Sequence, residues 1–292
     1  MNIDVLVNWL TAASLIAVML AMGVKVTLAD VLSSARQTRL VVLAVLANFV
    51  LVPLATAALL YAYGANPLTS VGFLVLAVSP GAPVGPPMTA LARGNVPFSI
   101  ALMILLAVLS AVISPALLGL LVPYVAPTSD LKIDYLAIVR TLLFVQLLPL
   151  ACGLGLRRWT PSISDRIGRP VGLLANVMLV ILIGLIVYSQ FSTLAAITLR
   201  AWTGMIFLLM ASLGIGWISG GRNVENRKAM AVTTASRNVA VGLVIANRNF
   251  ADTPAVIAVV AYGLFCILGT LACAAVLGRY GTRESGLIDA QR

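Results

Sequence analysis

The sequence predicts an all-α polytopic membrane protein with about nine transmembrane helices. Of its 292 residues, 61% are hydrophobic and only 10% are charged, and the mean hydropathy is +1.07. Apolar stretches of about 20 residues recur along the chain, which is the length that a helix needs to cross a bilayer. The first stretch begins at Val5 without a basic region or a small-residue cleavage site before or after it. We therefore interpret it as a membrane span and not as a signal peptide.

The apolar pattern divides the chain into nine expected spans that are joined by short polar loops. These spans cover roughly residues 5–24, 39–62, 68–93, 96–124, 134–156, 170–191, 197–218, 226–247 and 252–279. We expect them to form one transmembrane domain over residues 1–292, with residues 280–292 as a cytoplasmic tail. The lipid bilayer is thus the first expected partner.

The basic residues predict how the chain is oriented in the membrane. The net charge is +10, from 19 Lys and Arg against nine Asp and Glu. Two basic residues fall within spans, three lie in loops on the N-terminal side, and the other 14 lie on the C-terminal side. Cytoplasmic loops are enriched in Lys and Arg, so we expect the N-terminus outside and the C-terminus in the cytoplasm. This distribution indicates a plasma membrane, in a bacterium the inner membrane, and argues against a nucleic-acid partner.

Several residue types that carry chemistry are missing from the expected spans. The chain has no histidine, and all nine acidic residues fall in loops, tails or span ends. The spans therefore lack the usual groups for a proton relay and the base that an intramembrane enzyme needs. The three cysteines, Cys152, Cys266 and Cys273, show neither metal-ligand spacing nor a disulfide framework. We expect no enzyme activity, no resident metal and no cofactor.

Two expected spans interrupt their own helical pattern. Span 68–93 contains four prolines between residues 80 and 87, which cannot lie in one continuous helix because each proline lacks an N–H. Span 226–247 contains the polar run from Thr233 to Asn238. Unwound backbone at membrane depth is tolerated only where it is buried in protein or lines a cavity. Both interruptions are therefore expected to face an interior site.

The two interruptions occupy matching positions in the chain. Residues 1–126 and 131–279 are expected to form the halves of an inverted repeat, with the first four spans matching the last four and the fifth unpaired. Each interrupted span ends in a similar way, at Leu91–Val96 in one half and at Ile245–Phe250 in the other. Paired interrupted segments in an inverted repeat mark the binding site of many secondary transporters.

The motifs around these interruptions resemble those of the bile acid:sodium symporter family. Met22–Asp30 resembles the family's segment after an early span, Ser79–Asn95 its first crossover helix, and Leu148–Leu154 another shared patch. The ending Leu-Ala-Arg-Gly-Asn is the most specific piece, and Asn238 fits the second crossover. The resemblance covers nearly the whole chain. It implies a panel of helices beside a core with two crossing, unwound helices, and alternating access by rigid-body movement.

The chain departs from this family at positions where sodium-coupled members bind their ions. The family's Ser-Asn pair in the first broken helix corresponds here to Gly85 and Pro86. The glutamate and glutamine of the second broken helix correspond to Thr233 and Arg237. The resemblance thus implies that the anionic sodium ligand is lost and that a permanent positive charge stands nearby.

Of three further family positions, two retain an oxygen ligand. Ser99 keeps one of the two hydroxyl positions, Met103 replaces the other, and Asn48 represents a buried amide acceptor on an earlier helix. A hard cation prefers several oxygen ligands, and a guanidinium in low dielectric repels it. We expect that the usual sodium site is lost, so that sodium is possible but not expected.

Arg237 allows three interpretations. It can stand in for the missing sodium charge, because a guanidinium has five donors for the unpaired carbonyls at half-helix C-termini. It can bind an anionic substrate, because its fork suits a carboxylate or sulfonate. It can also be structural and extend to an interface or to cavity water. The full set of candidate substrate- or ion-binding residues is Arg237, Asn238, Thr233, Thr234, Ser236, Gly85, Pro86, Pro87, Thr89, Ser99 and Asn48.

The sequence and the resemblance together predict a secondary transporter of a small organic anion that works by alternating access and without sodium. One alternative is a sodium-coupled symporter with a degenerate site made of neutral oxygens from Asn48, Ser99, Thr233, Thr234 and Asn238. A second alternative, from a different class, is a membrane sensor that is built on a transporter scaffold and transports nothing.

Overall fold

The computed structural model describes residues 3–27, 29, 37–126, 134–189, 191, 195, 197–251 and 253–289, and its regular elements are helical throughout these ranges. The elements of the first half are α1 (Ile3–Lys25), α3 (Thr38–Leu46), η1 (Ala47–Leu51), α4 (Val52–Ala62), α5 (Pro67–Ala77), α6 (Gly85–Leu91) and α7 (Val96–Val125). Those of the second half are α8 (Tyr135–Leu142), η2 (Leu143–Leu147), α9 (Leu148–Trp159), α10 (Pro161–Ser189), α12 (Leu199–Ser219), α13 (Val224–Ala235), α14 (Val239–Asn249) and α15 (Pro254–Asp289).

The helices confirm an all-α polytopic membrane protein. Six described segments are long and apolar enough to cross a membrane, namely Thr38–Ala62, Val96–Val125, Tyr135–Trp159, Leu199–Ser219, Val224–Asn249 and Pro254–Arg279. Two shorter apolar helical stretches, Trp9–Lys25 and Pro67–Ala77, fall in the first and third predicted spans. Helix α10 fills the sixth predicted span, although it begins at Pro161, nine residues before the predicted boundary of 170.

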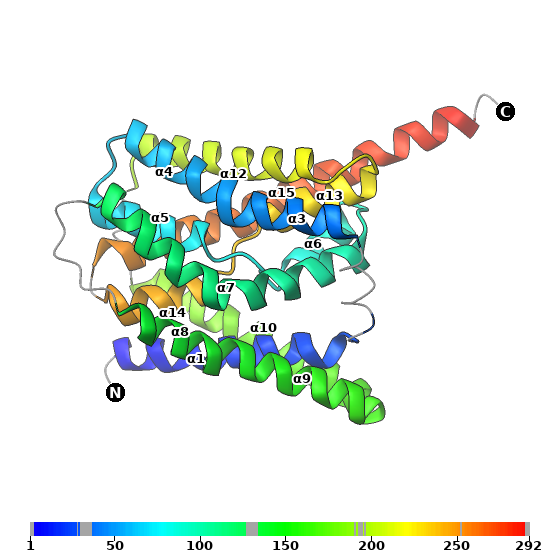
Figure 1. Ribbon diagram of the computed structural model, residues 1–292, viewed down its shortest axis with the longest axis horizontal. Helices are drawn as coiled ribbons and strands as arrows, with labels where there is room; N and C mark the ends of the chain where they lie inside the picture. The colour runs from blue at the N-terminus through cyan, green and yellow to red at the C-terminus, as the bar shows by residue number, and fades with distance from the viewer. Residues whose placement is uncertain are drawn as a thin grey trace.

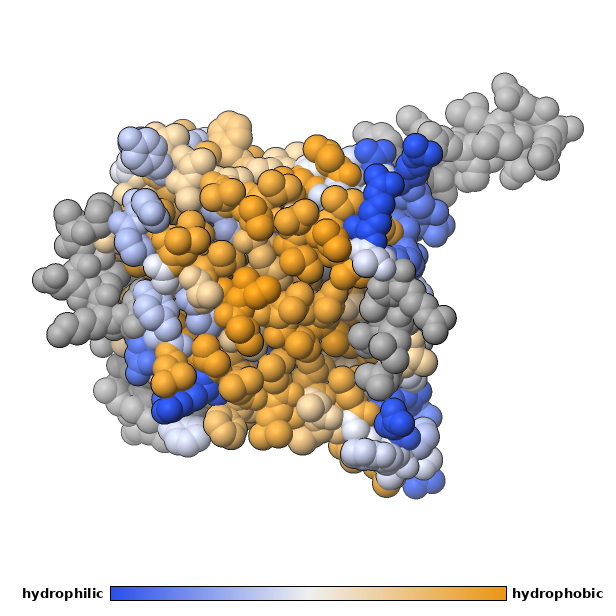
Figure 2. All heavy atoms as spheres, viewed as in Figure 1, coloured by the Kyte–Doolittle hydropathy of each residue, from blue (hydrophilic) through white to orange (hydrophobic). Residues whose placement is uncertain are grey.

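The surface is divided as a bilayer requires. A band of hydrophobic side chains crosses the middle of the visible face, and hydrophilic side chains gather at both ends of the helices (Figure 2). Exposed residues such as Val112, Leu120 and Phe144 contribute to this apolar surface. The start of α1 and the end of α15 lie at opposite ends of the bundle (Figure 1), as an odd number of crossings requires.

The helices form two groups. The first, which we call the panel, contains α1, α10 and the span made of α8, η2 and α9, with α1 packed against both α9 and α10 (Figure 1). Helices α1 and α9 approach closely where two glycines meet: a Cβ atom on Gly23 would lie 2.8 Å from the Cα of Gly153. Small residues permit such approaches in membranes, where apolar lipid provides no hydrophobic force between helices.

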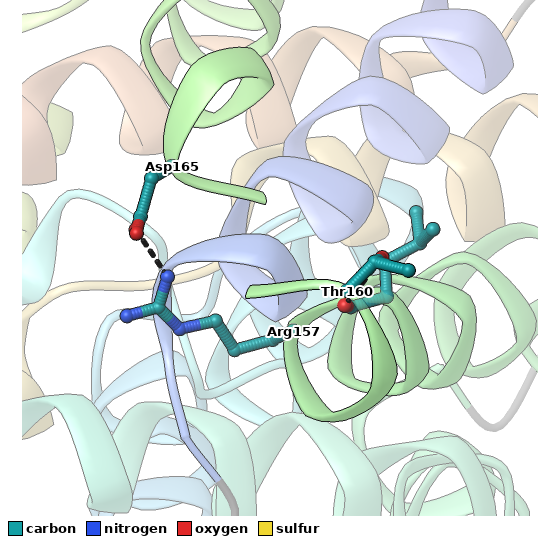
Figure 3. A network of polar contacts seen from close by, with 4 residues as sticks. Arg157, Thr160 and Asp165 are labelled. Atoms are coloured by element: carbon teal, nitrogen blue, oxygen red, sulfur yellow. Dashed lines mark hydrogen bonds and ion pairs between the residues drawn. The ribbon is translucent and has the colours of Figure 1, made fainter. Parts of the chain in front are cut away.

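The turn between α9 and α10 is closed by polar contacts at the edge of the panel. Arg157 forms an ion pair with Asp165, and the Thr160 hydroxyl donates a hydrogen bond of 2.9 Å to the Leu156 carbonyl (Figure 3). Pro161 then occupies the first position of α10, where its missing N–H needs no partner. These contacts hold α10 antiparallel to α9, beside α1.

The remaining helices, α3 to α7 and α12 to α15, form the second group, which we call the core. Its helices also approach through glycines, because a Cβ atom on Gly216 of α12 would lie 2.7 Å from Ala231 Cα on α13. Helices α13 and α14 are buried along their whole apolar window, unlike the other spans. The core therefore surrounds the second interrupted helix, which is the place that a binding site requires.

The inverted repeat with halves 1–126 and 131–279 stays a prediction. The described helices follow the same order in both halves, with a broken helix in third place and a long helix in fourth. Residues 131–133, at the start of the second predicted half, and residues 290–292, in the predicted tail, lie outside the described residues.

Candidate functional site

Both predicted interruptions break their helices, and the two breaks meet. Helix α5 ends at Ala77 and α6 begins at Gly85, while α13 ends at Ala235 and α14 begins at Val239. The backbone N–H of Asn238 donates a hydrogen bond of 2.8 Å to the Ser79 carbonyl. The two unwound segments therefore cross in direct contact within the core.

The first break is caused by its local sequence. Pro80 and Pro83 cannot donate backbone hydrogen bonds, so α5 cannot continue through them. Gly81 adopts a positive φ of 83°, a conformation that side-chain-bearing residues rarely adopt. A Cβ atom on Gly81 would also lie 2.6 Å from the backbone nitrogen of Ala107 on α7. Glycine is thus required both by the backbone conformation and by the close approach of α7.

Arg237 lies in the second break, at the point where the two breaks meet, and only 2% of its surface is exposed. Its Nη1 donates to the Ala77 carbonyl at 3.0 Å, and its Nη2 donates to the Thr234 carbonyl. These carbonyls belong to the C-terminal turns of α5 and α13, where helices carry unpaired acceptors and partial negative charge. The guanidinium therefore joins and neutralises the C-terminal ends of both half-helices.

Asn238 fixes the geometry of the crossing from the other side. Its Oδ1 accepts a hydrogen bond of 3.2 Å from the Val241 N–H and caps the N-terminus of α14. Its Nδ2 donates to the Gly81 carbonyl at 3.3 Å. The Asn238 side chain thus caps the start of α14 in one broken helix and binds the linker between α5 and α6 in the other. The neighbouring Ser236 is buried too, and its hydroxyl points to the Met88 sulfur at 3.8 Å.

Three buried hydroxyls form a chain between α6, α7 and α13. Thr89 donates to the Ser99 hydroxyl at 3.0 Å, and Ser99 lies 3.0 Å from the hydroxyl of Thr233. Gly85 faces the same cluster, because a Cβ atom there would lie 3.9 Å from both Ser99 Oγ and Thr233 Oγ1. Of the five residues predicted for the degenerate site, Ser99 and Thr233 are thus brought together, and their hydroxyls bind each other.

Asn48 reaches the second broken helix from an irregular turn. It lies in η1, a π-helical turn within the span formed by α3 and α4, and such turns are frequent at functional sites. Its Nδ2 donates to Ala44 O at 3.0 Å and to the Thr234 hydroxyl at 3.2 Å. Its Oδ1 is buried and has no hydrogen-bond partner among the described residues.

A cavity of about 220 Å³ lies between the panel and the core. It is lined by Val18, Ala21, Met22, Lys25, Val26, Pro83, Pro86, Pro87, Ile100, Met103, Gly172, Ala175 and Asn176. Pro86 and Pro87, both predicted site residues, are among them. The other predicted site residues lie deeper, at the crossing and in the hydroxyl chain, and none of them lines this cavity.

Sequence reasoning missed two polar residues of this cavity, Lys25 and Asn176. Lys25 was used only as one of the basic residues that predict the orientation. Its position within the family-like segment Met22–Asp30 is the one signal in the sequence that could have marked it as a site residue. Asn176 sits in the sixth span without any motif around it. A second cavity, of about 310 Å³, lies toward the start of α1 and includes Thr11, Asn247 and Arg248.

An integral membrane protein whose core holds two broken, crossing helices has the architecture of a secondary transporter. The sequence comparison agrees with this class: the chain belongs to the SBF-like CPA transporter family, whose model matches residues 4–275. The resemblance to the bile acid:sodium symporter family is thereby confirmed, and the chain is a transporter-type protein.

Two curated relatives are similar to this chain at low identity. One is a "probable sodium/metabolite cotransporter BASS3, chloroplastic" from Oryza sativa subsp. japonica, 26% identical over 154 residues. That match covers 53% of this chain and 35% of the rice protein, so it spans about a third of that relative's length. The other is an "uncharacterized sodium-dependent transporter YocS" from Bacillus subtilis (strain 168), 22% identical over 246 residues. It covers 82% of this chain and 74% of the relative.

Proposed function

We propose that the protein is a secondary transporter that moves a small organic anion by alternating access, without sodium, and with Arg237 in place of a coupling cation. The observation that carries this proposal is the pair of hydrogen bonds from the guanidinium to Ala77 and Thr234. The C-terminal ends of two half-helices face each other at the crossing, and they need a positive charge between them. A built-in guanidinium supplies that charge permanently.

A sodium ion would compete with Arg237 for the same acceptors. Two positive charges 5 Å apart repel each other by about 3 kcal/mol at an effective dielectric constant of 20. Sodium, a hard cation like calcium, also prefers several oxygen ligands, preferably with a carboxylate among them. The hydroxyls of Thr89, Ser99 and Thr233 are neutral and already bonded to one another. Both facts support a mechanism without sodium.

A sodium-coupled symporter is the second candidate. The names of both relatives describe sodium-dependent transport, and those names are the main support for this candidate. The unpartnered Oδ1 of Asn48 is a further free oxygen close to Thr234. In this candidate a residual site of neutral oxygens binds one ion near the crossing, while Arg237 is structural.

We further propose that the protein lies in a plasma membrane, the inner membrane in a bacterium, with its N-terminus outside and its C-terminus in the cytoplasm. The excess of Lys and Arg in the loops of the C-terminal side supports this orientation. Lys25, the last residue of α1, then lies at the cytoplasmic end of the panel.

Thermal unfolding of the purified protein tests the role of sodium before a substrate is known. Sodium that binds the folded state increases the free energy of unfolding by RT ln(1 + [L]/Kd), and the melting temperature therefore rises. We expect equal melting temperatures in sodium chloride, potassium chloride and choline chloride of the same ionic strength. A rise that is specific to sodium contradicts the built-in charge and favours the symporter.

Flux measurements test transport itself. Purified protein in liposomes should exchange labelled small carboxylates across the membrane in sodium-free buffer. Binding of a carboxylate without any flux favours the sensor alternative over a transporter. Flux that starts only when a sodium gradient is applied favours the symporter.

A further inference from the structure

We infer that Lys25 binds the anionic group of the substrate in the cavity between panel and core, and that Gly172 of α10 determines where its ammonium lies. This inference rests on the proposed transport of an organic anion. It names a specificity-determining residue and a size class of substrate for that function.

The side chain of Lys25 lies along a bare strip of α10. A Cβ atom on Gly168 would lie 3.8 Å from Lys25 Cγ, and one on Gly172 would lie 3.2 Å from Cε and 2.5 Å from Nζ. The two glycines are one helical turn apart and therefore share a face. A methyl group at residue 172 would occupy the place of the ammonium, so Gly172 sets the position of this charge.

The backbone of α10 does not require glycine at residue 172. Positive φ angles among the described glycines occur at Gly64, Gly81 and Gly221, and residue 172 lies inside a regular helix. At residue 172 the atoms that a Cβ would meet belong to the Lys25 side chain, whereas at Gly184, further along the same helix, a Cβ would meet nothing within 4 Å. The glycine at residue 172 thus leaves room for the Lys25 ammonium.

The cavity combines one polar wall with several apolar walls. Lys25 is its charged lining residue, and Asn176, one turn beyond Gly172, adds an amide on the same side. Pro86, Pro87 and the other core residues supply apolar surface opposite. This distribution suits a molecule with an anionic group at one end and an apolar body, in which an ammonium and an amide bind the carboxylate oxygens.

The cavity volume limits the size of that molecule. At about 220 Å³ it is smaller than the roughly 300–1,000 Å³ of pockets for drug-sized ligands. This volume favours a carboxylate with a short or branched carbon chain over a steroid acid. We therefore assign the site to small apolar monocarboxylates.

Arg237 is a positive charge at the crossing itself, and its geometry makes it a weaker candidate than Lys25 for binding substrate. It is 2% exposed, its guanidinium bonds two backbone carbonyls, and it does not line the cavity. Lys25 is exposed and lies at the cavity. The ion pair found among the described residues joins Arg157 and Asp165 and does not involve Lys25.

The experiment compares four proteins in liposomes of neutral phosphatidylcholine: wild type, Lys25→Met, Gly172→Ala and Arg169→Gln. Uptake of a panel of labelled short and branched monocarboxylates is measured against concentration. Arg169 is the matched control, because it is an exposed basic residue on α10 that does not line the cavity. Melting temperatures of all four proteins are recorded alongside.

We expect Lys25→Met to raise KM about ten-fold or more, which corresponds to about 1.4 kcal/mol, with an unchanged melting temperature. Gly172→Ala should raise KM several-fold although Lys25 is still present, because its methyl group displaces the ammonium. Arg169→Gln should leave KM unchanged. A fifth protein that combines Lys25→Met with Gly172→Ala should have a KM close to that of Lys25→Met alone, since both substitutions act on the same charge.

Three outcomes overturn the inference in distinguishable ways. An active wild type whose KM is unaffected by Lys25→Met contradicts the role of Lys25 but leaves the proposed transport intact. The uptake measurement is repeated in vesicles that contain anionic lipid. A change in KM for Lys25→Met that is seen only in those vesicles assigns the ammonium to lipid headgroups and contradicts substrate binding. A wild type that moves no carboxylate, although it is folded by its melting curve, contradicts the proposed function and this inference together.

Discussion

Arg237 lies inside the core and Lys25 at the cavity between core and panel, and the surroundings of these two positive charges differ in every respect. Arg237 is buried at the crossing, where two half-helix carbonyls accept its hydrogen bonds. Lys25 is exposed at a cavity, where its side chain lies against Gly168 and Gly172 of α10. The hydrogen bonds of the buried charge go to the protein backbone, and on our proposal the exposed charge binds a ligand. Charge near a transport site therefore has to be interpreted through its partners, not through its depth alone.

The largest expected effect is that of Arg237→Met on stability. The substitution leaves the carbonyls of Ala77 and Thr234 buried without a donor, at a cost of about 1–3 kcal/mol each. We expect a melting temperature several degrees lower, measured by thermal unfolding in detergent. Lys25→Met is the matched control and should melt like the wild type. Equal melting temperatures for wild type and Arg237→Met would contradict the idea that the guanidinium neutralises the C-terminal ends of the two half-helices.

A second large effect is expected at the linker that Arg237 and Asn238 hold. Gly81→Ala forces alanine into a φ of 83° and places its Cβ 2.6 Å from Ala107 N, so we expect a loss of about 3 kcal/mol. Gly214→Ala is the control, because a Cβ there meets no atom within 4 Å. The comparison of the two melting curves checks the prediction, and a Gly81→Ala protein as stable as the control contradicts it.

Asn238→Ala is expected to have an intermediate effect. It removes the cap of α14 and the bond to the Gly81 carbonyl, and the loss of a helix cap alone costs about 0.5–2 kcal/mol. Asn238→Asp keeps the capping oxygen and loses the donor to Gly81, so it should fall between wild type and Asn238→Ala. Unfolding curves of the three proteins test this order, and the reverse order would show that the cap is unimportant.

The smallest effect is expected for Ser99→Ala. The variant loses hydrogen bonds within the hydroxyl chain of Thr89 and Thr233, for which about 1 kcal/mol is typical. Under the proposed mechanism, carboxylate flux in sodium buffer and in potassium buffer should remain equal in this variant, as in the wild type. If sodium stimulates the wild type and Ser99→Ala abolishes that stimulation, the hydroxyl chain is a sodium site and the symporter is correct.

The sequence predicted the two breaks because their causes are local. Prolines between residues 80 and 87 and the polar run from Thr233 to Asn238 interrupt a helix wherever they occur in a span. The partners of Arg237 were not predictable, since the Ala77 carbonyl comes within reach only once the two broken helices cross. A charge substitute and a substrate ligand look alike in a sequence, and the hydrogen bonds support the first.

Lys25 shows a different limit of sequence reasoning. Its position at the end of a span makes it part of the pattern of basic residues that predicts the orientation, but the glycine face opposite it belongs to α10, far along the chain. The π-helical turns at η1 and η2 were also not predictable, because each adds one amide, Asn48 or Gln146, to residues that are otherwise as apolar as those of an ordinary span. Contacts between distant segments, rather than composition, decide both features.

The covalent attachment of Arg237 has a consequence for the direction of transport. A sodium ion that travels with an anion cancels its charge, but a guanidinium fixed in the chain returns with the carrier and cancels nothing over a full cycle. Each monocarboxylate moved alone would then carry one net negative charge across the membrane. At an inside-negative potential of 100 mV, that charge is worth about 2.3 kcal/mol, or roughly a 50-fold ratio of concentrations in favour of the outside. On this proposal the membrane voltage makes the protein an exporter, unless the anion is exchanged for another of equal charge.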